Sequence, residues 1–140
     1  MTISLHAVSR IKLALLALLF GGISFLAPTH SKAQSSILYD FYTAPSGPYV
    51  ATNVAITRVQ THLDQIKTQM EANNPQSDNY KYLSIKHDFF SIIYDQLVAG
   101  KTVKESIEAG LRIFTTDVAS GLPKAKREEF KQEAINLLKP

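Results

Sequence analysis

Apolar residues recur at helical spacing through most of the chain beyond residue 48. From about Tyr49 to Ala72 they fall at steps of three and four, which places them along one face of an α-helix. Asn73 and Asn74 can close that helix, and Pro75 cannot continue it because it lacks a backbone N–H. The pattern therefore predicts a first helix that ends just before Pro75. Its apolar face is formed by Ile56, Val59, Leu63, Ile66 and Met70.

A second helical pattern starts at Ser77, a residue type that caps helix N-termini, and continues to about Ala99. Its apolar stripe is wide and rich in aromatic side chains, so this helix is predicted to be the most buried. The stripe consists of Leu83, Phe90, Ile93 and Leu97, widened by Tyr82, Phe89, Tyr94 and Val98.

The sequence Gly100-Lys101-Thr102 ends as a phosphate-binding loop does. Such a loop needs a second glycine five residues before Gly100, where its backbone wraps the phosphates, but Asp95 occupies that position. A turn accounts for these residues better. Gly100 ends the second helix in a left-handed conformation, and Thr102 starts a third helix in a capping box with Glu105. We therefore predict a turn and no nucleotide site.

The third helix is predicted from about Val103 to Ala119, with Gly110 in its interior at a cost of about 1 kcal/mol relative to alanine. We interpret this glycine as a point of close approach between two helices, with room for a ligand as the alternative. Pro123 suits the first turn of a fourth helix, which reaches about Leu138. The apolar positions of these two helices are Val103, Ile107, Leu111, Phe114 and Val118, then Phe130, Ala134, Leu137 and Leu138.

Four helices joined by short turns predict an all-α fold, an antiparallel up-and-down four-helix bundle over residues 49–140. Its core is expected where the apolar stripes face one another. The predicted core residues are Ile56, Val59, Leu63, Ile66, Leu83, Phe90, Ile93, Leu97, Ile107, Leu111, Phe114, Phe130 and Leu137.

Residues 34–48 differ from the rest, because apolar and aromatic side chains alternate as in a strand between Ile37 and Tyr42. We expect a short extended aromatic arm with one of two roles. It closes one end of the bundle, which would bury its aromatic side chains. Alternatively, it docks on the sheet edge or groove of a partner protein, with Tyr39, Phe41 and Tyr42 as the binding residues.

Residues 1–33 have the layout of a secretory signal peptide. Two basic residues precede an apolar run of fifteen residues from Leu13 to Ala27, which is shorter than the roughly 20 residues of a membrane span. Small side chains at Ser31 and Ala33 predict cleavage between Ala33 and Gln34. We therefore expect export to the periplasm or the cell exterior, and no stable membrane insertion after cleavage.

The charge balance changes when the signal peptide is removed. Arg10, Lys12 and Lys32 leave with it, so residues 34–140 hold twelve basic against twelve acidic residues. A formal net charge of zero creates no global positive field, and we expect no nucleic-acid partner. Cysteine is absent, which excludes thiol catalysis, iron–sulfur clusters and cysteine-ligated zinc.

Two histidines follow residue 33, His62 and His87. Asp64 and Asp88 are near them in sequence, so a metal site of two histidines and a carboxylate is conceivable across the first helical hairpin. However, both histidines sit beside their apolar stripes, and the helical spacings typical of metal ligands, His-x₃-His and Glu-x-x-His, are missing. We favour the interpretation that both are partly exposed histidines at the edge of the bundle.

Sequence motifs of catalytic sites are missing after residue 33, where neither Gly-x-Ser-x-Gly, Ser-x-x-Lys nor a dinucleotide fingerprint occurs. The sequence therefore predicts an exported, non-enzymatic helical module that binds a protein partner or a small apolar ligand and uses no cofactor. The alternative is a small metal-binding protein or a metal-assisted hydrolase that uses His62 and His87.

Overall fold

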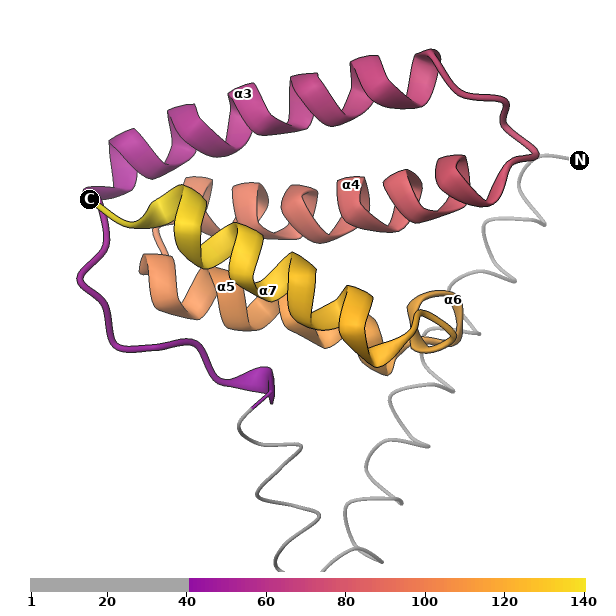
Figure 1. Cartoon of the computed structure of the whole chain (residues 1–140). Coiled ribbons are helices and arrows are strands. Elements are labelled where there is room, and N and C mark those ends of the chain that lie inside the picture. The colour runs from indigo at the N-terminus through magenta and orange to yellow at the C-terminus, as the bar shows by residue number, and fades with distance from the viewer. Residues whose placement is uncertain (1–40) are drawn as a thin grey trace, which may run out of the picture. The chain divides into compact units, whose positions relative to one another are not determined.

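The computed structural model describes residues 41–140, and the secondary structure of these residues is entirely helical (Figure 1). Five α-helices and one short 3₁₀ helix, η2, lie between residues 52 and 138. The predicted signal peptide, its cleavage site and residues 34–40 of the predicted arm, including Tyr39, lie outside the described residues. The elements are α3 (Thr52–Glu71), α4 (Asp78–Val98), α5 (Val103–Leu111), η2 (Arg112–Thr115), α6 (Asp117–Ser120) and α7 (Lys124–Leu138).

The chain enters α3 from a segment of irregular structure, residues 43–51. The backbone N–H of Val50 donates a hydrogen bond to the carbonyl oxygen of Leu138 at 2.9 Å, which ties this segment to the end of α7. Ala51 is extended, with φ −60° and ψ 149°. Helix α3 therefore begins at Thr52, slightly later than the apolar pattern predicts.

The turn between α3 and α4 ends at the predicted cap. The Ser77 hydroxyl oxygen accepts a hydrogen bond of 3.1 Å from the backbone N–H of Tyr80. This bond satisfies one of the donors that the first turn of a helix leaves without an intrahelical partner. Asp78 adds a negative charge at the same end, where the helix dipole favours it.

The turn between α4 and α5 confirms the interpretation of the Gly100-Lys101-Thr102 sequence. Gly100 is left-handed, with φ 87°. The N–H groups of Gly100 and Lys101 donate to the carbonyl oxygens of Leu97 and Gln96, both at 3.0 Å, which is the Schellman pattern of a helix C-terminus. Thr102 then forms the predicted capping box with Glu105.

The third helix is shorter than predicted. Helix α5 ends at Leu111, η2 follows, and Thr116 is extended with ψ 153° before the short helix α6 begins. Two threonine hydroxyls bond locally to the backbone: Thr115 donates to the carbonyl of Arg112 at 2.7 Å, and Thr116 donates to that of Ile113 at 2.6 Å. Such bonds compete with continuation of a helix.

The interruption of the helix at residues 112–116 turns Val118 away from the core. The periodic pattern places this side chain on the buried stripe, and that prediction is wrong, because 77% of Val118 is exposed. Once the chain leaves the α-helical path at residues 112–116, the helical phase that starts at Val103 no longer applies to the residues that follow.

Eleven of the thirteen predicted core side chains are buried, whereas Ile56 and Leu137 are only partly buried and pack against the core from its edge. In α3 the fully buried positions Ala55 and Val59 are four residues apart, so Ile56 lies at the margin of that stripe. The confirmed core residues are Val59, Leu63, Ile66, Leu83, Phe90, Ile93, Leu97, Ile107, Leu111, Phe114 and Phe130.

Four phenylalanines meet in the core. The ring centroids of Phe89 and Phe90 are 5.0 Å apart, Phe89 lies 6.0 Å from Phe130, and Phe114 lies 5.9 Å from Phe130. These separations are typical of favourable aromatic pairs. The cluster therefore joins α4, η2 and α7 at one place.

Gly110 marks a close approach of α5 to α4, as the sequence indicates. A Cβ atom at this position would lie 2.8 Å from Cγ1 of Ile93 and 3.1 Å from Cε2 of Phe89. Both neighbours are fully buried. Glycine is required here for packing, because any other side chain would overlap α4.

The four longer helices are neighbours in a closed order. Helix α3 packs against α4, α4 against α5, α5 against α7, and α7 against α3. Among the described residues, none of the helices has the length and apolar character needed to cross a membrane.

Candidate functional site

A polar network connects three helices through one carboxylate. The Nε2 atom of His62 in α3 lies 2.7 Å from Oε1 of Glu133 in α7, and Nζ of Lys86 in α4 lies 2.9 Å from Oε2 of the same residue. Because a carboxylate only accepts hydrogen bonds, His62 donates through Nε2. The His62 ring also packs edge-on against Phe90, with centroids 4.5 Å apart.

This network sets the protonation of Glu133. Burial raises the pKa of its carboxyl group, but the hydrogen bonds from His62 and Lys86, together with their charges, lower it by more, and the net direction is down. Lys86 is well enclosed: its side chain is 14% exposed, and its Nζ lies 5.3 Å from the ring centroid of Tyr82 and 5.5 Å from that of Phe130. The network therefore joins α3, α4 and α7 through charged side chains.

Tyr82 extends this polar network toward the surface. Its hydroxyl lies 3.4 Å from Oε2 of Glu129, and Nζ of Lys126 lies 5.1 Å from its ring centroid. Burial, then the negative charges of Glu129 and Glu133, raise the pKa of Tyr82 to about 12. The phenol therefore keeps its proton across the physiological range, as a hydrogen-bond donor requires.

The two histidines occupy different environments. His87 contacts Ser91, with 3.4 Å between Nδ1 and the hydroxyl oxygen, and it lines a cavity of about 460 Å³ with Lys67 and Met70. Asp64 accepts a hydrogen bond from Gln60. Within residues 41–140, histidine and carboxylate side chains form no group of three or more that could hold a metal ion. A metal site shared by His62 and His87 stays a hypothesis.

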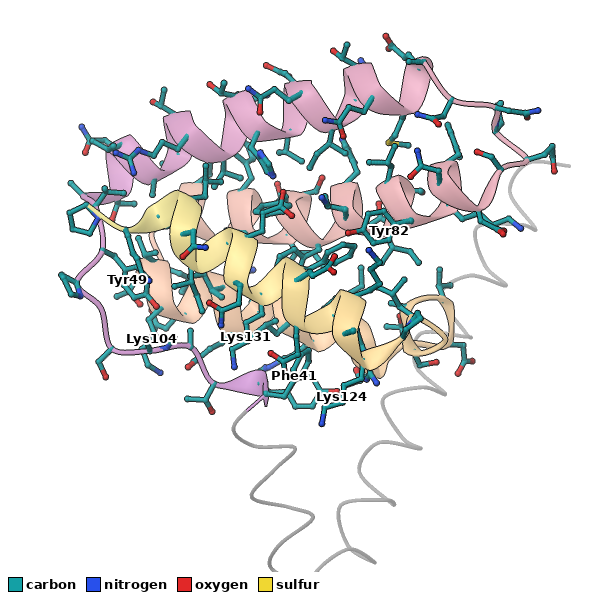
Figure 2. All side chains as sticks on the ribbon, viewed as in Figure 1. Phe41, Tyr49, Tyr82, Lys104, Lys124 and Lys131 are labelled. Atoms are coloured by element: carbon teal, nitrogen blue, oxygen red, sulfur yellow. The ribbon has the colours of Figure 1, made fainter. Side chains whose placement is uncertain are left out.

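The described part of the arm packs on the core. Phe41 and Tyr42 have helical rather than extended backbone, and both are half-buried. The Phe41 ring centroid lies 5.7 Å from that of Phe114. Figure 2 shows Phe41 close to Lys131 of α7, whose ammonium group donates a hydrogen bond of 2.8 Å to the Phe41 carbonyl oxygen.

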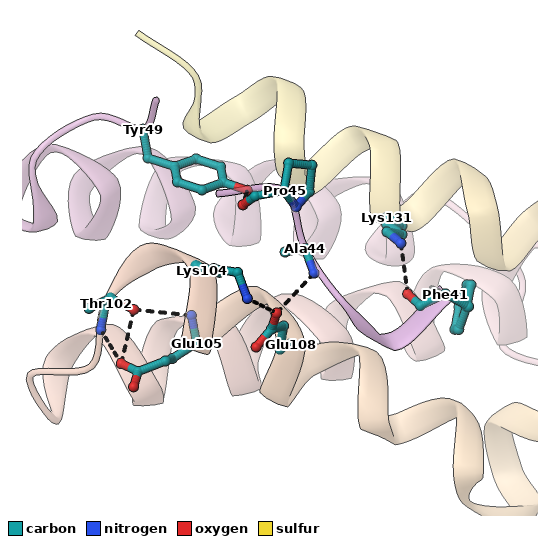
Figure 3. A network of polar contacts seen from close by, with 9 residues as sticks. All are labelled: Phe41, Ala44, Pro45, Tyr49, Thr102, Lys104, Glu105, Glu108 and Lys131. Carbon is teal, nitrogen blue, oxygen red and sulfur yellow. Dashed lines mark hydrogen bonds and ion pairs between the residues drawn. The ribbon is translucent and has the colours of Figure 1, made fainter. Parts of the chain in front are cut away.

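The residues after Tyr42 are held to α5 (Figure 3). The backbone N–H of Ala44 donates to Oε1 of Glu108 at 3.0 Å, and Lys104 pairs with the same carboxylate. Ala44 is buried, and the hydroxyl of Tyr49 closes a local turn by donating to the carbonyl of Pro45 at 2.7 Å. These contacts agree with an arm that covers part of the core, and docking of a partner there stays a prediction.

A groove of about 470 Å³ lies between the first half of α4 and the segment that contains α6. The exposed side chain of Val118 stands at its α6 side, together with the half-buried Leu122. On the α4 side, Tyr80 and Ile85 are also half-buried, so the groove is walled by apolar and aromatic surface. The described residues that line it are Pro75, Asp78, Tyr80, Lys81, Tyr82, Ser84, Ile85, Asp88, Val118, Gly121 and Leu122.

The sequence pattern predicted neither the polar network nor the groove. Glu133 reads as one of several charges on an exposed face of the fourth helix, and only its position three residues after Phe130 and one before Ala134 hints at the edge of the apolar stripe. The groove depends on the helix break before Val118, which the periodic pattern does not contain.

Comparison with known proteins adds no constraint, since the chain matches no protein-family model, no curated protein and no solved structure.

Proposed function

We propose that this chain is an exported, non-enzymatic helical module that binds a small apolar ligand in the groove between α4 and α6. In this proposal α3, α4, α5 and α7 form an antiparallel four-helix bundle preceded by an aromatic arm. The bundle supplies a rigid scaffold, and the groove lies at the end where the regular helix pattern stops.

The groove is the observation that carries the proposal. A volume of about 470 Å³ lies in the range of small-molecule sites, which are mostly apolar with a few polar groups. Val118 is 77% exposed, and it lines the same groove as Leu122 and Ile85. A ligand that covers Val118 would remove this apolar surface from water.

The non-enzymatic part of the proposal rests on how the polar groups are used. His62, Lys86 and Glu133 contact one another between three helices, and they do not line the groove. Export rests on the layout of residues 1–33. Intact-mass measurement of protein from the envelope or medium checks export, and we expect a chain that starts at Gln34.

Titration of the purified protein with 1-octanol, followed by amide chemical shifts, tests ligand binding. We expect saturable shifts centred on Ile85, Val118 and Leu122. Substitution of Val118 by serine should weaken binding about five-fold, because part of the valine's transfer free energy, about 1 kcal/mol, is lost.

Val98→Ser is the matched control. Val98 is also exposed, at 58%, but it lies at the end of α4 and does not line the groove. The Val98→Ser variant should bind octanol with the same affinity as the unaltered protein. Shifts that fail to saturate, or that spread equally over Val98 and Val118, would contradict a defined site.

A further inference from the structure

The groove between α4 and α6 has an uneven distribution of charge. Three of the described residues that line it are charged: Asp78, Lys81 and Asp88. Lys81 and Asp78 are 3.8 Å apart and form an ion pair, which leaves these two charges mutually compensated. Asp88 is exposed and has no hydrogen-bond or ion-pair partner within residues 41–140.

The position of Asp88 relative to the apolar wall is fixed by the geometry of α4. Ile85 and Asp88 are three residues apart and therefore share one face of the helix. Both line the groove opposite Val118 and Leu122. An apolar ligand lying against Ile85 and Val118 therefore has the Asp88 carboxylate within the same groove.

We propose that the ligand of this groove is an amphipathic organic cation, an apolar body carrying one amine or quaternary ammonium group, with Asp88 as its counter-ion. This inference rests on the proposed function and narrows its ligand class. The apolar body covers Ile85, Val118 and Leu122, and the positive group lies beside the Asp88 carboxylate, which has no partner among residues 41–140.

An anionic ligand fits the charges of this groove less well than a cation does. Among the lining residues within 41–140, Lys81 is the one cation, and its side chain is 67% exposed and paired with Asp78. An anion bound at Lys81 would lie beside Asp78 and would approach Asp88, both of them like charges. Like-charge proximity disfavours binding, so charge complementarity selects the cation.

Three probes with the same alkyl chain test the inference: octyltrimethylammonium, 1-octanol and octanoate, each kept below its critical micelle concentration. Calorimetric titration should give an affinity for the cation about two- to five-fold higher than for octanol, the range typical of a single exposed ion pair, and the weakest affinity for octanoate. The preference for the cation should fall as salt is added, because salt screens exposed charges.

Asp88→Asn is the diagnostic variant, and Asp95→Asn is its matched control. Both remove one negative charge from an exposed position of α4, but Asp95 does not line the groove. We expect Asp88→Asn to bind the cation and octanol equally, and Asp95→Asn to keep the preference of the unaltered protein.

The outcomes separate this inference from the proposed function. If octanol binds at the groove and the cation binds no better, the charge assignment is wrong while the apolar site stands. A preference for octanoate, or an equal effect of both substitutions, also overturns the assignment. If none of the three probes binds, the proposed function itself fails.

Discussion

His62 and Glu133 connect α3 to α7 through a hydrogen bond of 2.7 Å, and the His62 ring packs edge-on against the ring of Phe90. The two residues are 71 positions apart in sequence. Lys86 approaches the other oxygen of the same carboxylate at 2.9 Å, so Glu133 satisfies two donors from two different helices. The relationship fixes how three helices meet at one point beside the apolar core.

Glu133→Gln should destabilise the protein. A glutamine side chain has one acceptor oxygen and one NH₂ group, so either His62 or Lys86 would face a donor instead of an acceptor. An enclosed donor left without a partner costs about 1–3 kcal/mol, and we expect a loss in this range in the free energy of unfolding measured with urea.

Glu71→Gln is the control for this substitution, because Glu71 is exposed at the last turn of α3. Removal of a negative charge from a helix C-terminus should leave stability unchanged or slightly higher. If Glu133→Gln and Glu71→Gln unfold at the same urea concentration, the network does not hold the helices together.

The pH dependence of stability follows from the same carboxylate. The folded structure lowers the pKa of Glu133 from 4.5, so below this value the unfolded chain binds a proton more readily than the folded protein does. The stabilisation is therefore fully present above about pH 4.5 and is lost as the pH falls through the lowered pKa.

The difference in unfolding free energy between the unaltered protein and Glu133→Gln measures this effect. It should be largest above about pH 4.5 and should shrink as the pH falls below that value. Glu105, whose pKa is lowered mainly by its hydrogen bond from the Thr102 backbone, is present in both proteins and cancels in the difference. A difference that stays constant over this range would show that ionised Glu133 contributes nothing.

Local features of the fold were predictable because their causes are local. Gly100, Thr102 and Glu105 define the turn between α4 and α5 within six residues, and the structure shows the predicted left-handed glycine and capping box. Likewise, Ser77 caps α4 through a bond to Tyr80. The steric and hydrogen-bonding demands of a helix end involve only neighbours in sequence.

Features that depend on distant contacts were not predictable. Nothing in the spacing of Leu111, Phe114 and Val118 signals a break, since the chain holds neither glycine nor proline between Gly110 and Gly121. The η2 turn nevertheless places Phe114 among the rings of the core and leaves Val118 outside. The packing of Phe114 and the local threonine bonds together accompany the break, and a hydrophobic period of 3.6 residues contains neither.

Gly110→Ala should destabilise the protein although alanine is the better helix former. The new Cβ would lie 2.8 Å from a carbon of the fully buried Ile93, whose surroundings are closely packed. Overpacking of this kind costs about 1–3 kcal/mol, against a gain of about 1 kcal/mol in helix propensity, so we expect a net loss of up to about 2 kcal/mol.

Thermal unfolding of Gly110→Ala beside Gly121→Ala checks this expectation. A Cβ atom at Gly121 meets nothing within 4 Å, so that substitution should leave the melting temperature unchanged or slightly higher. A higher melting temperature for Gly110→Ala would mean that α4 and α5 are not in close contact at this position.

Phe41→Ala distinguishes the two roles of the arm. The Phe41 ring lies 5.7 Å from Phe114 and 4.9 Å from Tyr42, and the charged ends of Arg127 and Lys131 lie 5.9 and 5.6 Å from its centroid. If these contacts close the core, the substitution should cost about 1–3 kcal/mol, less than the roughly 3–5 kcal/mol expected for the fully buried Phe90.

Urea unfolding of Phe41→Ala and Phe90→Ala gives the comparison directly. If the arm serves only as a docking element, Phe41→Ala should cost almost no stability, because the Phe41 side chain would make its main contacts with the partner. A loss below about 0.5 kcal/mol, the range of ordinary surface substitutions, would therefore favour docking through Tyr39, Phe41 and Tyr42. A loss above about 1 kcal/mol would show that Phe41 is part of the folded core, and a partner would then have to bind elsewhere, with the groove beside Val118 as the site to test first.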